Sequence, residues 1–141
     1  MTKSSIVYVL TPFLGWIVAQ TIKIYLCLRK DGITWHDTIQ SGGMPSSHAA
    51  FMISLTTLIA IGVGITSVAF AISLALSAII IYDSTGVRRT TGEQTDAFKK
   101  LAKKVGSKID IKHDARGHTP AEALAGVAVG MIVGIMTSIF L

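Results

Sequence analysis

The sequence is poor in cysteine and in charge. Its 141 residues include one cysteine, Cys27, which excludes an intramolecular disulfide and a zinc site built mainly from cysteines. Only 15% of the residues are charged, against about 25% in a typical soluble domain. Half of the residues are hydrophobic, which excludes a disordered chain, and the length suits one domain.

The few charges are concentrated in one part of the chain. Fourteen of the 21 charged residues lie between Tyr82 and His118, and none lies between Ala49 and Tyr82. Apolar runs separated by charged loops are typical of an integral membrane protein. The same placement argues against a nucleic acid partner, despite the net charge of +5.

The apolar runs predict an all-α protein, a membrane bundle of four helices that forms one domain over 1–141. The run 49–82 is too long for one span, and glycine and serine near its centre have turn chemistry, so we expect a helical hairpin there. The four expected spans are 5–28, 47–64, 67–84 and 119–141. A charged, partly helical loop over 85–117 connects the third span to the fourth.

The basic residues predict the orientation in a cell membrane. Nine Lys and Arg residues lie in 85–117, and Arg29 and Lys30 lie in the other long loop, 29–46. The positive-inside rule therefore assigns both long loops of this multi-pass protein to the cytoplasm. Within 85–117, apolar residues recur at helical spacing among lysines: Phe98, Leu101, Ala102 and Val105. Such a helix can lie on anionic membrane lipids, and a solvated extension of the third span is the alternative.

Two short motifs carry the chemistry. The first, SGGMPSSH over 41–48, precedes the second span. Gly43 lets the backbone bend around an anion, and the N-terminus of a helix offers unpaired N–H groups. Ser46 and Ser47 add hydroxyl donors, and His48 adds a group that titrates near neutrality. The alternative is a plain loop with a helix cap and an interfacial histidine.

The second motif, GHTPAE over 117–122, begins the fourth span. His118 and Glu122 are four residues apart and share one face of a helix that begins early enough. A carboxylate there can hold the Nδ1–H of the imidazole and leave Nε2 free as a nucleophile or base. The alternative is that Glu122 only complements the helix dipole.

The predicted topology brings both motifs to one membrane face, because the hairpin returns the chain to the side from which it started. Lys23, Asp83, Arg88 and Arg89 are expected on the same side. A cluster of cations, serines and backbone donors suits a phosphate group. A metal site from His48, Asp83, His118 and Glu122 is disfavoured because the surrounding lysines and arginines repel a cation.

Taken together, PSSH over 45–48, YDSTGVRR over 82–89 and HTPAEALAG over 118–126 resemble the divergent PAP2 family. This family is related to the type 2 phosphatidic acid phosphatase superfamily, which also includes bacterial acid phosphatases and vanadium haloperoxidases. The resemblance runs from about Gln20 to the C-terminus. It implies a PAP2-like bundle that hydrolyses lipid phosphates through a phosphohistidine, without a cofactor or metal.

The resemblance also implies roles for individual residues. His118 matches the nucleophile, Glu122 stands where an aspartate orients it, and His48 matches the general acid. The implied phosphate-binding residues are Lys23, Ser46, Ser47 and Arg88 or Arg89. The chain departs from the family pattern in several places. Lys30-Asp31 stands where the family has Arg-Pro, Ser47 replaces a glycine, and Glu122 replaces an aspartate. Lys112 occupies the usual arginine position, and Arg88 and Arg89 lie 30 and 29 residues before His118.

A membrane protein that binds anionic lipid headgroups or a partner without turnover is the alternative to a phosphatase. The last span also contains a repeated G-x-x-x-G at Gly126, Gly130 and Gly134. Such glycines bring helices close together in membranes. We expect them to pack the fourth span inside the monomer, and a homodimer through the same glycines is the alternative.

Overall fold

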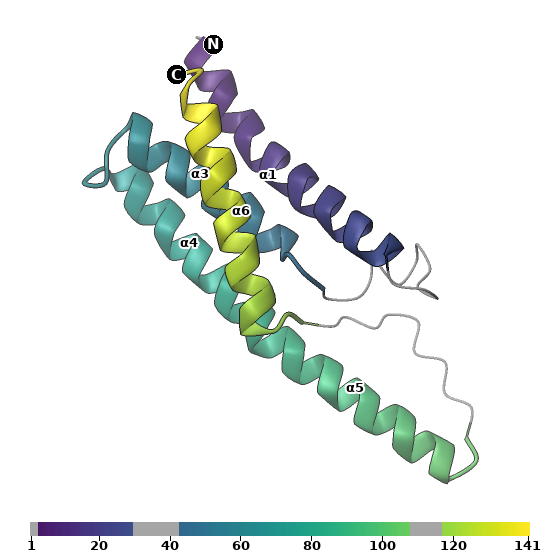
Figure 1. Cartoon of the computed structure of the whole chain (residues 1–141). Coiled ribbons are helices and arrows are strands. Elements are labelled where there is room, and N and C mark those ends of the chain that lie inside the picture. Colours follow the sequence, from purple (N-terminus) through teal and green to yellow (C-terminus); the bar gives the residue numbers. More distant parts are fainter. Residues whose placement is uncertain (1–2, 30–42, 108–116) are drawn as a thin grey trace.

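The computed structural model of the protein describes residues 3–29, 43–107 and 117–141. Every regular element within these ranges is a helix, as Figure 1 shows. The helices are α1 (Lys3–Leu28), α3 (Ser47–Gly62), α4 (Val68–Thr85), α5 (Val87–Lys104) and α6 (Pro120–Ser138). The predicted all-α bundle is therefore confirmed.

Helix α3 lies at the centre of the bundle and packs against α1, α4 and α6. The N- and C-termini lie together at one end (Figure 1). Gly62, at the end of α3, meets the Tyr8 hydroxyl and the side chain of Leu141 so closely that a Cβ there would collide with both. This end of the bundle is thus closed by the termini, and the opposite end holds the starts of α3 and α6 and the end of α4.

The lengths of the helices bear on how the chain crosses a membrane. Three stretches in the described part of the chain are long and apolar enough to span: Ser5–Leu28, Val68–Lys104 and Pro120–Ser138. Helix α3 is apolar but has 16 residues, which corresponds to about 24 Å, somewhat less than the roughly 30 Å of a hydrocarbon core. The turn before α4 contains Gly64 at a φ of +104°, and the Ser67 hydroxyl caps α4 by accepting from the Phe70 N–H at 3.1 Å.

The interior of the bundle is built from small residues, while large apolar side chains face outward. The Ser54 hydroxyl lies 3.3 Å from the Thr11 carbonyl oxygen, and the hydroxyls of Thr56 and Ser77 are 2.9 Å apart across α3 and α4. Phe13 and Ile132 are more than half exposed. Small, hydroxyl-bearing interfaces with an apolar exterior are what helices packed in lipid require.

The glycines of α6 pack this helix against α3 within the monomer. Gly126, Gly130 and Gly134 are buried. A Cβ at Gly130 would lie 2.8 Å from the Ala50 carbonyl oxygen and 2.9 Å from Ile53 Cβ. This agrees with the expected packing inside the monomer. Because α3 occupies this face, a homodimer through the same glycines would require the two helices to separate.

Replacing Gly130 with valine is expected to destabilise the bundle by at least about 1–3 kcal/mol, since the added side chain overlaps the α3 backbone. Ala128→Val, on the exposed face of the same helix, is the matched control and should have little effect. Thermal unfolding in detergent measures both. Equal melting temperatures for the two variants would contradict the α3–α6 packing.

Candidate functional site

The first motif is fixed where α3 begins. Ser46 is fully buried and is the N-cap of α3, its hydroxyl lying 3.4 Å from the Ala49 N–H. Its own N–H donates to the Glu122 carbonyl oxygen at 3.0 Å. Gly126 lies directly against the Ser46 carbonyl, where a Cβ would collide. These contacts fix the loop that contains Ser46 and Ser47, called the serine loop below, to the first turns of α6.

The second motif is fixed to the end of α4. The His118 N–H donates to the Ser84 carbonyl oxygen at 2.8 Å. Gly117 lies against the backbone of Arg89 and Ser84, where no side chain would fit. These contacts set the position of His118 relative to the junction of α4 and α5.

The start of α6 is a capping box. The Thr119 hydroxyl accepts from the Glu122 N–H at 3.3 Å, and Glu122 Oε2 accepts from the Thr119 N–H at 2.8 Å. The same Oε2 lies 3.5 Å from His118 Nδ1. Glu122 therefore caps the helix and also lies beside the His118 ring.

His118 is buried, and its two ring nitrogens are not equivalent. Nδ1 is fully buried and makes no hydrogen bond within the described part of the chain, although Glu122 is near. Nε2 is therefore the ring nitrogen left for an incoming group. Burial lowers the pKa of His118 below its usual value, and the Lys23 charge lowers that pKa further, while the Glu122 carboxylate opposes the shift. The neutral imidazole is thus favoured.

Lys23 reaches the site from the last turns of α1. The Lys23 side chain is only 5% exposed and passes close to Gly43. A Cβ atom added to Gly43 would lie 3.9 Å from Lys23 Cδ. Gly43 has a φ of +110°, a conformation that favours glycine. The charge of Lys23 acts on His48 and His118 and interacts with that of Glu122. A buried cation therefore lies within electrostatic reach of both histidines.

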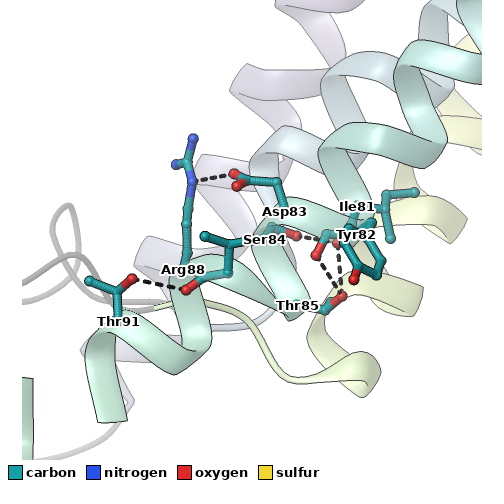
Figure 2. A network of polar contacts seen from close by, with 8 residues as sticks. Ile81, Tyr82, Asp83, Ser84, Thr85, Arg88 and Thr91 are labelled. Carbon is teal, nitrogen blue, oxygen red and sulfur yellow. Dashed lines mark hydrogen bonds and ion pairs between the residues drawn. The ribbon is translucent and has the colours of Figure 1, made fainter. Parts of the chain in front are cut away.

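His48 is exposed in the first turn of α3 and lies within the electrostatic reach of Arg88, Lys23 and Asp83. Arg88 Nε donates to Asp83 Oδ2 at 2.7 Å. Figure 2 shows these two side chains turned toward one another, Asp83 from the end of α4 and Arg88 from the start of α5. Asp83 thus holds Arg88 within electrostatic reach of His48.

The two arginines diverge in the structure. Arg89 donates to Glu93 Oε1 at 3.1 Å, an exposed pair one turn along α5.

The remaining candidate residues complete the site. Ser47 is buried in the first turn of α3. Lys112, the alternative phosphate-binding cation, lies outside the described residues. The structure therefore gathers His48, His118, Glu122, Lys23, Gly43, Ser46, Ser47, Asp83 and Arg88 at one end of the bundle, and directs Arg89 elsewhere.

Two contributors were not singled out from the sequence. Ser84 supplies the carbonyl that holds His118, and its hydroxyl donates to the Ile81 carbonyl at 3.0 Å (Figure 2). Thr119 supplies the cap that positions Glu122. The S/T-x-x-E pattern of a capping box was the available signal for Thr119, whereas a backbone acceptor such as Ser84 leaves no trace in the sequence.

The described residues also bear on metal binding. In the ranges that the structure covers, no group of three or more His, Cys, Asp and Glu side chains is arranged to hold a metal ion.

Comparison with known proteins connects this arrangement to a family. The chain is 41% identical over 88 residues to an uncharacterized membrane protein of Bacillus subtilis, YuiD, a match that covers 60% of this chain and 54% of that protein. The chain thus aligns with about half the length of this relative. No solved structure matches it. The model of the divergent PAP2 family matches residues 5–133, a range that includes every residue of the site, and the chain therefore belongs to the divergent PAP2 family of helical membrane proteins.

Proposed function

We propose that this protein hydrolyses the phosphomonoester of a lipid through a phosphohistidine intermediate. The observation that carries the proposal is the meeting of two histidines, a carboxylate and two cations at one end of an apolar bundle. Family membership supports a relation to phosphatases. A membrane setting favours a substrate whose tail stays in the bilayer while its phosphate reaches the site.

Lys23, Arg88 and the serine loop are the proposed phosphate ligands. Lys23 and Arg88 lie within electrostatic reach of His48. Ser46 and Ser47 lie at the start of α3, where the positive end of the helix dipole is located. A phosphoryl group bears negative charge on its equatorial oxygens, so cations and N–H donors held in place before the reaction lower its barrier.

The proposed reaction has two steps. In the first, His118 Nε2 attacks phosphorus, the bond from phosphorus to the ester oxygen breaks, and protonated His48 gives its proton to the departing alkoxide. In the second, His48 takes a proton from water, the water oxygen attacks phosphorus, and the electron pair of the P–N bond returns to His118. Glu122, 3.5 Å from Nδ1, stabilises the charge that forms on the His118 ring.

The test is phosphate release by the purified full-length protein from lipid phosphates in the presence of EDTA. The panel contains phosphatidic acid, phosphatidylglycerophosphate and a polyprenyl phosphate. Release that EDTA spares supports the proposal. A folded protein that binds these lipids but releases no phosphate would overturn it in favour of lipid binding without turnover.

The pH profile of kcat/KM tests the state of His118. Protonated His118 cannot attack, so activity should rise with pH through its pKa, and burial together with Lys23 lowers that pKa below the ordinary value of about 6.5. Lys23→Gln removes a cation that lowers the pKa of His118, so that pKa should rise and the acid limb of the profile should move to higher pH. This shift is separate from any overall loss of activity caused by weaker phosphate binding. An acid limb at the same pH in Lys23→Gln and wild type would contradict the placement of Lys23 within electrostatic reach of His118.

The two adjacent arginines offer a matched pair. Arg88→Ala should lower kcat/KM by about 10²-fold, the usual cost of losing one charged donor to a developing anion. Arg89→Ala removes only an exposed pair with Glu93 and should change kcat/KM less than about threefold. Equal losses in the two variants would show that Arg88 has no special role.

The proposed membrane face of the site is the cytoplasmic one, because α5 and its basic residues leave the bundle at this end. A cysteine placed at Gln94 in a Cys27→Ser background, tested in whole cells with a reagent that does not cross membranes, measures the side. Labelling of intact cells would contradict the cytoplasmic assignment.

A further inference from the structure

Helix α5 leaves the bundle and extends beyond it (Figure 1). Among the described helices it packs only against α4, from which Gly86 alone separates it. Gly86 has φ −103° and ψ −85°, outside the helical region, and its N–H still donates to the Tyr82 carbonyl at 2.8 Å. Helix α5 therefore continues from a membrane-length helix through one non-helical glycine.

The far half of α5 exposes an apolar stripe. Phe98 and Leu101 are 52% and 58% exposed, and Val105 at the C-cap is 73% exposed. Their spacing of three and four residues aligns them on one face of the helix. Ala102, the fourth residue of this apolar row, is buried, but no described helix other than α4 contacts α5, so packing between the described helices does not explain the exposed Phe98 and Leu101.

The charge around this stripe is of one sign. Four lysines lie in the last six residues of α5: Lys99, Lys100, Lys103 and Lys104. The two acidic residues of the helix, Glu93 and Asp96, precede them. Every charged residue within 98–105, the segment that contains Phe98, Leu101 and Val105, is therefore a lysine.

We infer that the occupant of this face is an anionic lipid surface, that of the bilayer which α4 enters. Apolar side chains bordered by lysines bind acyl-chain boundaries and anionic headgroups together. A second copy of α5 is disfavoured, because pairing two such faces would bring two lysine clusters together. Helix α4 ends at Thr85, and α5 runs on beyond the bundle in much the same direction (Figure 1). The inference therefore requires α5 to turn at the non-helical Gly86 when the protein is in a bilayer, so that the stripe reaches the lipid surface.

This inference does not rest on the proposed reaction, and its test does not use activity. The full-length protein in a Cys27→Ser background receives one cysteine at Leu101, on the stripe, or at Lys103, on the opposite side of α5. Each is labelled with an environment-sensitive dye and reconstituted into vesicles of phosphatidylcholine alone or mixed with phosphatidylglycerol.

The dye at 101 should shift its emission to the blue and be quenched by lipid-borne quenchers in the mixed vesicles. The shift should be smaller in phosphatidylcholine alone and should weaken at high salt. The dye at 103 should stay in water throughout. Replacing Lys100, Lys103 and Lys104 with glutamine should remove the dependence on phosphatidylglycerol.

Two results would overturn the inference. The first is a dye at 101 that is equally exposed to water in both kinds of vesicle. The second is a dye at 101 that is equally shielded from water in detergent and in vesicles and that lipid-borne quenchers do not quench. The second result would mean that protein, from this chain or another, covers the stripe.

Discussion

Replacing His118 with alanine is expected to abolish phosphate release, lowering kcat by about 10⁴-fold or more, as loss of a covalent nucleophile commonly does. The reason is geometric, since Nε2 of this ring is the nitrogen left for an incoming phosphorus while Nδ1 is buried beside Glu122. Phosphate release from the lipid panel, compared between wild type and variant, measures the effect.

The variant should still fold. The contact that fastens residue 118 to α4 is its backbone N–H to the Ser84 carbonyl, which alanine retains. An unchanged melting temperature and retained binding of the lipid phosphate would confirm this. Gln94→Ala, an exposed change on α5, is the control. Full activity in folded His118→Ala would exclude the phosphohistidine route.

Replacing His48 with alanine is expected to affect substrates according to their leaving group. An alkoxide departs poorly without a proton, so hydrolysis of an alkyl phosphate should fall by about 10²–10⁴-fold. An aryl phosphate such as p-nitrophenyl phosphate needs no proton donor in the first step, so its phosphoryl transfer to His118 should fall far less. Single-turnover kinetics with both substrates measure the two losses.

The comparison also carries its own control. Because His48 is exposed on the first turn of α3, its removal leaves no buried cavity, and both substrates are tested on the same preparation. An equal loss of the first step for alkyl and aryl substrates would contradict a proton-donating role and leave His48 as a phosphate ligand.

The arrangement of the helices was predictable from the distribution of charge and of turn residues. The uncharged run 49–82 with a turn at its centre predicted a hairpin, and the structure has α3 ending at Gly62 and α4 beginning at Val68. This hairpin brings His48 and His118 to the same end. The prediction succeeded because a membrane constrains helix length and direction more strongly than water does.

The finer features depended on geometry that the sequence does not carry. Arg88 and Arg89 are equivalent as neighbours in a motif, but successive residues on a helix point about 100° apart, so one meets Asp83 and the other Glu93. The apolar spacing predicted a short helix near 98–105, whereas α5 begins at Val87, since Gly86 interrupts the helix for a single residue. The carbonyl of Ser84 was beyond prediction, because any residue can supply a backbone acceptor.

The measurement that tests the central claim most directly is a search for the phosphoenzyme. His48→Ala is mixed with radiolabelled aryl phosphate, quenched in alkali and digested with trypsin. We predict an alkali-stable, acid-labile label on the peptide that begins at Gly117, which contains His118, and no label in the variant that also lacks His118. Release of phosphate without any labelled intermediate, or a label on another peptide, would contradict the account.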